Sequence, residues 1–404
     1  MYSLSILFFS LPLYFSHVFS PIGVTIWESY SFERYKVYLF LILLVVAYIE
    51  WLIRYPQRIW NIVRKYAHII ALLFVIPIAS AFYFATPLDL DWLMGSHEKH
   101  HGYLFYTGVI SLIILLMANP REHLRHYITW SIASAILVAV IAIWEHIWGI
   151  LDIYDRSEMI SAYPGRSSST LGNPNYVAGY LIAFIPIVLV NISNIQSALS
   201  MNKVIATLLS STIVSCVIIA IAVTGSHIAI LLLGILILWY SVHYVLHRYT
   251  IEKQIIIFAT VVSILILWLL SLLDPMKLLS LQSRFVLMQE SIKIMFVHPI
   301  SLLVGFGPDA LLTQFSLSRS TLVSAYFPQN MLIDSSHNIF IDILFQYGAF
   351  PVFLLIRFLF IAWNKLTTPI GLSISLLLGF LTFNVFVVSH LIILILLLVF
   401  ICKS

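Results

Sequence analysis

Apolar runs of about 17–25 residues recur along the whole chain, and each is long enough to cross the hydrocarbon core of a bilayer as an α-helix. Hydrophobic residues make up 61% of the 404 residues and charged residues only 9%, whereas roughly a quarter of a soluble globular domain is charged. Membrane-spanning strands would alternate apolar and polar residues over shorter segments, a pattern that this sequence does not show. We therefore exclude a soluble globular fold and predict an all-α, polytopic membrane helix bundle.

These runs predict about twelve transmembrane helices in one integral membrane domain that covers residues 1–404. One long polar stretch, residues 274–337, separates the ninth run from the tenth. We expect it to be a large extracytoplasmic loop that contains amphipathic helices. The expected spans are approximately 4–24, 35–53, 67–86, 103–118, 127–150, 176–194, 204–224, 227–246, 254–273, 338–363, 370–388 and 390–402.

Charge alternates between the connecting loops, and this alternation indicates how the chain is oriented. Excess Lys and Arg in short loops marks the cytoplasmic side of a membrane protein. We therefore expect both termini in the cytoplasm and the loops 87–102, 151–175 and 274–337 on the extracytoplasmic side of the cell membrane. The basic residues of the other loops are Arg54, Arg58, Arg64, Lys65, Arg121, Arg125, Lys203, Arg248, Lys253, Lys365 and Lys403.

The composition also limits the partners and cofactors. The net charge of +4 comes from basic residues in short loops, so we expect membrane lipids and no nucleic acid as partners. The only cysteines, Cys216 and Cys402, are far apart and lie in or beside apolar runs. Glu98, His100 and His101 match no strong metal-ligand spacing. We predict no disulfide framework, no metal site and no cofactor.

Arg166 and Asn175 are the first substrate-binding candidates. They lie at the end of the loop 151–175, which is rich in Ser, Gly, Asn and Pro. An arginine among hydroxyl groups at the edge of a helix bundle is suited to hold a phosphate oxygen. Asn175 is suited to cap the following helix. The alternative is that these residues only form a turn before the helix.

Arg284 begins a stretch whose apolar residues recur at helical spacing up to His298, which indicates an amphipathic helix on the outer surface. We take Arg284 as a catalytic candidate and Lys293 as a substrate-binding candidate. The alternative is an interfacial helix whose cations only snorkel toward water, and we favour it for Lys293 and His298 but not for Arg284. Gly305-Phe-Gly307-Pro-Asp309 lacks the strand and the Lys-Ser/Thr of a phosphate loop, so we discard a nucleotide site.

His337 and Asn338 lie where the tenth apolar run begins. Histidine titrates near neutral pH and can take a proton from a reacting group, so His337 is the second catalytic candidate and Asn338 a binding candidate. The alternative for His337 is a helix-start hydrogen bond without chemistry. Asp342 lies about 140° round an ideal helix from His337, and we expect it to be a buried structural partner. His227, which follows the Thr224-Gly-Ser hinge, is a further binding candidate.

At these positions the chain resembles the O-antigen ligase and O-antigen polymerase (Wzy-type) superfamily of bacterial polysaccharide assembly. The resemblance covers roughly residues 163–363 and rests on three blocks in a fixed order. The blocks are Ser169-Thr-Leu-Gly-Asn-Pro-Asn175-Tyr-Val-Ala-Gly179, then Arg284 followed by His298-Pro and Gly305-Phe-Gly307-Pro, and finally His337-Asn338 with Gly348.

The chain departs from the family pattern at two positions. The family usually has an arginine after the Thr-x-Ser hinge, where this chain has His227. That difference removes a permanent charge and a bidentate donor, so phosphate binding at this position is in question. The second glycine of the family, three residues past Gly348, is Pro351 here.

The resemblance implies glycosyl transfer at the outer leaflet, from an undecaprenyl-pyrophosphate-linked glycan donor to a glycan or lipid acceptor. Such a donor already carries its leaving group, so neither a nucleotide nor a metal is required. Arg284 and Arg166 would neutralise the pyrophosphate, and His337 would take the proton of the attacking hydroxyl. Grooves between helices, lined by Phe, Trp and Leu, would admit the polyprenyl tail from the bilayer.

Two questions stay open at the level of sequence. A polymerase and a ligase differ only in the acceptor, and we favour a polymerase because nothing marks a lipid-A-core or protein acceptor site. The alternative of another class is a lipid-linked glycan flippase or another polytopic transporter. A transporter predicts charges near the bilayer midplane and symmetrical halves, whereas the candidates here gather on one face and the two halves differ in loop size.

Overall fold

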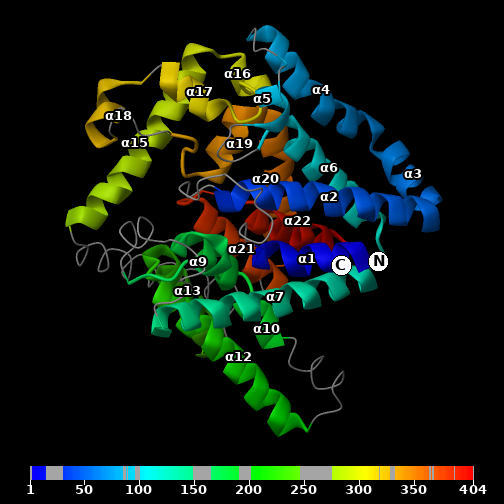
Figure 1. Ribbon diagram of the computed structural model, residues 1–404, viewed down its shortest axis with the longest axis vertical. Helices are drawn as coiled ribbons and strands as arrows, with labels where there is room; N and C mark the ends of the chain where they lie inside the picture. The colour runs from blue at the N-terminus through cyan, green and yellow to red at the C-terminus, as the bar shows by residue number, and fades with distance from the viewer. Residues whose placement is uncertain are drawn as a thin grey trace, which may run out of the picture.

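The computed structural model describes residues 2–14, 31–84, 88, 90–95, 101–148, 165–190, 202–245, 275–317, 319–327, 333–363, 365, 368–385 and 387–403. Within these ranges every regular element is a helix, which confirms the predicted all-α class (Figure 1). The expected span 254–273 lies outside the described residues. The helices are α1 (Tyr2–Leu13), α2 (Ser31–Arg54), α3 (Pro56–Lys65), α4 (Ala67–Tyr83), α5 (Leu90–Met94), α6 (Tyr103–Ala118), α7 (Arg121–Trp148), the 3-10 turn η2 (Ser169–Leu171), α9 (Pro174–Ile182), α10 (Ile185–Val190), α12 (Lys203–Thr224), α13 (His227–Val245), α15 (Pro275–Val297), α16 (Ser301–Val304), α17 (Ala310–Leu317), α18 (Thr321–Tyr326), α19 (Ile339–Tyr347), α20 (Ala349–Trp363), α21 (Pro369–Leu381) and α22 (Val388–Cys402).

The main core lies around α22, which contacts α1, α2, α6, α7, α9, α20 and α21. Nearly every residue of α22 is buried. A helix that is apolar all round is stable only inside a protein or a membrane, and the run of Ile, Leu and Val in this helix is therefore placed at the centre. Its first turn, near His390, lies at the same end of the bundle as the candidate residues described below.

By length and composition, three described helices can cross a membrane: Glu33–Arg54, Arg121–Trp148 and Thr207–Thr224. A fourth is added if α3 and α4, which are bent by 74°, form one broken span. Seven further apolar helices are shorter, with 10–17 residues. The expected run 176–194 is divided between α9 and α10, and the run 338–363 is broken at Gly348 into α19 and α20. The described part of the chain therefore has fewer full-length spans than the predicted twelve.

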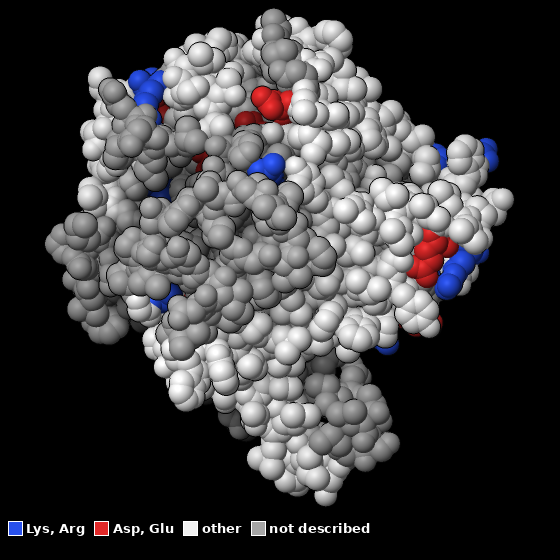
Figure 2. All heavy atoms as spheres, in the orientation of Figure 1, with Lys and Arg blue, Asp and Glu red and all other residues white. Residues whose placement is uncertain are grey.

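The long apolar helices leave much of their surface uncovered. Only 33% of the apolar window of α2 and 28% of that of α12 are buried inside the protein. Ile53 on α2, Leu208 on α12 and Phe360 on α20 are each more than 60% exposed. Among the described residues on the face shown in Figure 2, a few charged groups lie between broad white areas of uncharged residues. Uncovered apolar surface of this extent marks contact with a membrane or a partner.

The segment predicted as the loop 274–337 carries four helices, α15, α16, α17 and α18, which Figure 1 shows grouped beside α19. The helix expected to begin near Arg284 is α15, and it starts nine residues earlier, at Pro275. These helices have a core of their own, in which Leu287, Met295 and Phe306 pack with Phe345 of α19. The segment is therefore an ordered cap on the bundle where it is described.

Basic residues from several predicted cytoplasmic loops meet at one end of the bundle. The Lys403 ammonium donates to the Met117 carbonyl at 2.6 Å and also to the Asn119 carbonyl. The Lys365 ammonium donates to the Ile401 carbonyl at 2.8 Å. Loops that the charge pattern assigns to one side of the membrane thus lie together, next to the C-terminal end of α22.

Candidate functional site

Arg284 and the turn that carries His337 and Asn338 are bound to the same short segment. The guanidinium Nη1 of Arg284 donates to the Phe383 carbonyl and, at 3.3 Å, to Oδ1 of Asn384. Nδ2 of Asn338 donates to the Thr382 carbonyl at 3.1 Å. Residues 382–384 follow α21, so the C-terminal end of that helix joins Arg284 to the turn that carries His337.

The turn 335–338 is held from inside the bundle by Asp342. Its carboxylate, which is buried, accepts hydrogen bonds from the Ser335 hydroxyl at 2.7 Å and from the backbone N–H and hydroxyl of Ser336 at 2.7 and 2.6 Å. The expected structural role of Asp342 fits this geometry. His337 has a φ of +59°, a backbone conformation that costs a residue with a side chain about 1–3 kcal/mol.

Asn338, and not His337, is the cap of α19. Its Oδ1 accepts from the backbone N–H groups of Phe340 and Ile341 at 3.0 and 3.2 Å. This arrangement satisfies two of the four N–H groups that a helix start leaves without intrahelical partners. The His337 imidazole is therefore not used to start the helix. It is half-buried, and its neighbour Asn338 bonds to the segment that also holds Arg284.

Arg166 forms a second polar group with Asn175 and the hinge between α12 and α13. Its Nε donates to the Thr224 carbonyl at 2.7 Å, and its Nη2 donates to Oδ1 of Asn175 at 3.0 Å. The prediction that Asn175 caps the next helix was wrong. Asn173 is the cap of α9, since its side chain accepts from the Asn175 N–H at 2.8 Å. Pro174 then occupies the first helical position, where proline is favoured.

Gly225 has no Cβ, and the Arg166 side chain packs closely against it. A Cβ at Gly225 would lie 3.2 Å from Nε of Arg166, and the glycine has a φ of +60°. His227 follows two residues later at the first position of α13, where it is exposed. Arg166, Asn175 and His227 therefore gather around one hinge.

The two polar groups are joined through α9, α21 and α22. His390 at the start of α22 bonds through Nε2 to the Tyr176 carbonyl at 2.8 Å, next to Asn175. The His390 ring also lies edge-on to Phe380 of α21, with ring centroids 5.9 Å apart. Asn384, which contacts Arg284, donates through Nδ2 to the Phe380 carbonyl at 3.1 Å. The two arginines are thus attached to adjoining helix ends in one region of the protein.

Lys293 lies away from this region. It is nine residues beyond Arg284 on α15, which on an ideal helix is about 13 Å along the axis and on the opposite face. Its side chain is 65% exposed and its ammonium is 3.5 Å from the Glu290 carboxylate. The structure therefore does not bring Lys293 together with Arg284, because both residues belong to one continuous helix.

The Gly305-Phe-Gly307 motif packs backbone against backbone. The Phe306 N–H donates to the Phe345 carbonyl at 2.8 Å, and the Gly307 N–H donates to the Gln346 carbonyl at 3.0 Å. A Cβ at Gly305 would lie 2.3 Å from the Gln346 carbonyl oxygen, and φ there is +72°. These contacts bind the end of α19 to the cap segment, so the helix that begins after His337 is fixed at both ends.

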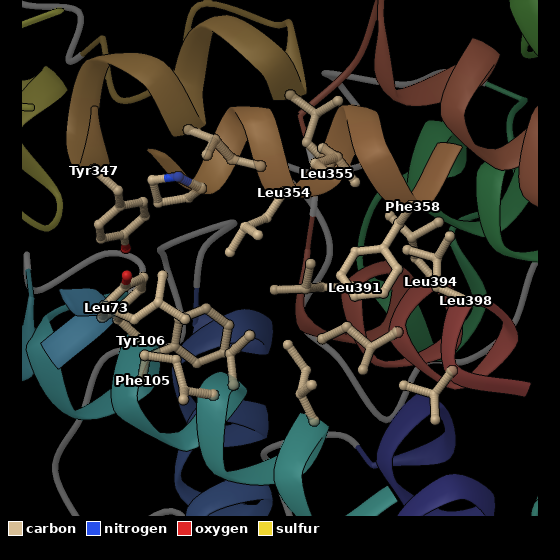
Figure 3. Close-up of a pocket in the computed structure, with 18 residues that line it drawn as sticks. Leu73, Phe105, Tyr106, Tyr347, Leu354, Leu355, Phe358, Leu391, Leu394 and Leu398 are labelled. Atoms are coloured by element: carbon tan, nitrogen blue, oxygen red, sulfur yellow. The ribbon is translucent and has the colours of Figure 1, made fainter. Parts of the chain in front are cut away.

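An apolar groove runs between α6, α19, α20 and α22, with a volume of about 170 Å³ (Figure 3). Ile339 and Leu391 line it. Ile339 follows the His337 turn directly, and Leu391 lies in the first turn of α22. Figure 3 shows the hydroxyl ends of Tyr106 and Tyr347 turned toward each other at one end of the groove. Their rings stack with centroids 4.3 Å apart. The groove offers space for a narrow apolar chain.

Several polar residues of this region were not among the predicted candidates. Asn384 contacts Arg284, and Glu33, Lys36 and His390 are buried near the start of α22. Charged residues inside an apolar span are a signal of function. Glu33 was not predicted as a residue inside a span, because the second span was expected to begin at residue 35, two residues after it.

Among the described residues, no group of three or more His, Cys, Asp or Glu side chains is arranged to hold a metal ion. No protein-family model matches the sequence. No curated protein and no solved structure matches the chain either.

Proposed function

We propose that this protein is a membrane glycosyltransferase that acts on undecaprenyl-pyrophosphate-linked glycans at the outer leaflet and polymerises, or ligates, cell-surface polysaccharide repeat units. The observation that carries the proposal is the attachment of Arg284 and the His337–Asn338 turn to one segment, residues 382–384. A cation and a neutral-pH base on one side of a helix bundle are what a pyrophosphate donor and a hydroxyl acceptor require.

In the proposed reaction, the acceptor hydroxyl attacks the anomeric carbon of the donor glycan. The bond between that carbon and the pyrophosphate oxygen breaks, and its electron pair leaves with undecaprenyl pyrophosphate. His337 takes the proton of the hydroxyl. Arg284 and Arg166 stabilise the charge that develops on the leaving pyrophosphate. Asn338, Asn175 and His227 supply further hydrogen-bond donors at the edge of the site.

The apolar surfaces support a lipid-linked donor. The groove between α6, α19, α20 and α22 is lined almost wholly by apolar side chains, which suit a hydrocarbon chain. We assign the polyprenyl tail to it. The exposed apolar faces of α2, α12 and α20 support a bilayer around the bundle.

We further propose that the chain crosses the membrane about twelve times, the shorter apolar helices and the undescribed run 254–273 included. The end of the bundle with Lys365 and Lys403 then faces the cytoplasm, by the excess of basic residues in short loops. Arg284 and His337 belong to the end with the 274–337 segment, which would face outward.

A flippase or another transporter is the alternative class. Transport sites are usually built near the bilayer midplane from broken helices of two related halves. The break at Gly348 between α19 and α20 is one such feature. We favour transfer over transport because the arginines and His337 lie at helix ends, in a protein that also has a groove lined by apolar side chains.

Deletion of the gene followed by gel analysis of the surface glycan separates these functions. Loss of high-mass polymer with single repeats retained indicates a polymerase. Polymer that stays on its lipid carrier indicates a ligase. Lipid-linked repeats stranded on the cytoplasmic leaflet indicate a flippase and would contradict the proposal. Complementation with His337→Ala, checked for insertion and abundance, then tests the assigned base.

A further inference from the structure

The loop between Arg166 and Asn175 is held by two buried side chains of opposite charge. Lys36 of α2 is completely buried, and its ammonium donates to the Thr170 carbonyl at 3.0 Å. Glu145 of α7 is 8% exposed and accepts from this loop on the other side. One charge therefore holds a carbonyl of the loop, and the other holds its N–H and hydroxyl groups.

Glu145 accepts three hydrogen bonds from this loop. Its carboxylate accepts from the Ser167 hydroxyl at 2.8 Å, from the Ser168 hydroxyl at 3.3 Å and from the Ser169 N–H at 2.6 Å. The three donors follow directly after Arg166 in the chain. The Ser169 backbone has a φ of +46°, an unfavourable conformation that surrounding contacts must maintain.

Lys36 has a buried carboxylate near it on its own helix. Glu33, one turn earlier on α2, interacts with it electrostatically, and the Glu33 carboxylate also accepts from the Val388 N–H and lies 3.5 Å from Nε2 of His101. Burying such charges is costly unless they are paired and hydrogen-bonded. A buried Lys-Glu pair is weak evidence for stability in itself, so its position against a loop that ends in candidate residues indicates another role.

We infer that Lys36 and Glu145 are positioning residues for Arg166, and that they fix the loop 165–175 so that the guanidinium is aligned for a pyrophosphate ligand. The alignment follows from the contacts. Lys36 and Glu145 bind the middle of the loop. The hydrogen bond of 3.0 Å from Nη2 of Arg166 to Oδ1 of Asn175 joins its two ends. The inference rests on the proposed function for the identity of the ligand only.

A double-mutant cycle in the full-length protein tests this inference. Removal of Lys36 alone would take a nearby positive charge away from the buried Glu33 carboxylate, so the perturbation is the pair Glu33→Gln with Lys36→Met. The second perturbation is Arg166→Gln. Lys65→Met, which removes the same charge from an exposed position on α3, is the control. Binding of undecaprenyl pyrophosphate is titrated for each variant and for the combination, and a melting curve is recorded for each.

We expect Arg166→Gln to weaken binding by about ten- to hundredfold, the range for a charge-assisted hydrogen bond. The Glu33→Gln/Lys36→Met pair should weaken binding roughly threefold or more, and this loss should vanish in the Arg166→Gln background. Lys65→Met should bind like the wild type. Unchanged affinity in the pair variant, or an equal loss in both backgrounds, would overturn the inference.

Amide hydrogen exchange over residues 165–175 separates this inference from the proposed function. If the wild type binds no undecaprenyl pyrophosphate, the proposed function fails, and exchange still decides whether the loop is held as described. The pair variant and Glu145→Gln should each exchange faster in this segment than Lys65→Met. Exchange that matches the control in both variants would exclude the positioning role.

Discussion

Substitution of Gly348 by alanine should destabilise the protein far more than the same change at Gly234. Gly348 lies between α19 and α20 with a φ of +78°, and a Cβ there would lie 2.1 Å from the Leu303 carbonyl oxygen. The strained backbone alone costs about 1–3 kcal/mol for a residue with a side chain. A contact of 2.1 Å with a backbone atom also cannot be relieved by a rotamer change.

The displacement that relieves this contact must separate α16 from the end of α19. The bonds from the Phe306 and Gly307 N–H groups to the Phe345 and Gln346 carbonyls lie directly beside Gly348. Loss of each costs about 1 kcal/mol. We therefore expect Gly348→Ala to lower the free energy of unfolding by about 3–5 kcal/mol in total.

Gly234→Ala is the matched control. Gly234 lies within α13, and nothing lies within 4 Å of a Cβ built there. Alanine is favoured over glycine in a helix by about 0.5–1 kcal/mol. Thermal and denaturant unfolding of both purified variants measures the difference. If Gly348→Ala melts at or above the temperature of Gly234→Ala, the close approach of the two backbones is not present in the protein.

Three further changes test the site. His337→Ala should reduce glycosyl transfer by about 10²- to 10⁴-fold while the donor still binds, and a correctly inserted variant with a wild-type rate would exclude His337 as the base. Asn338→Ala should lower the free energy of unfolding by about 2 kcal/mol, since it loses the helix cap and the bond to the Thr382 carbonyl. Asn338→Asp keeps the cap, and chemical unfolding should show about half that loss. Leu354→Trp, which narrows the groove, should weaken binding of the undecaprenyl donor but not of free pyrophosphate, and the adjacent Phe353→Trp, at a position 61% exposed, should leave both unchanged.

Helices with long apolar runs were predicted well, and those that depend on distant contacts were not. The expected spans 35–53, 103–118 and 204–224 correspond closely to α2, α6 and α12, because a continuous apolar run satisfies its backbone hydrogen bonds only as a helix. The break at Gly348 follows from the approach of residue 303, which no local pattern records. Asn173 was recognisable as the cap of α9, since Pro174 follows it.

In the candidate site, too, the sequence indicated some residues and not others. Arg166, Arg284 and His337 stood out because charged and titratable residues are scarce in this chain. Their neighbours did not. Asn384 resembled any polar residue at a helix end, and Lys36 lay just inside a predicted span. Lys293 was included for its charge, although helical geometry places it opposite Arg284 on the same helix.

The order of apolar and polar residues by itself determined that this chain is helical and rich in surface suited to lipid, because both properties depend on neighbours within a few turns. Only the tertiary structure decided which polar residues meet. Arg284 contacts a segment 99 residues away, and Lys36 contacts Thr170 across 134 residues. Such contacts depend on how whole helices pack, and packing is selected by the complementary shapes of many side chains at once.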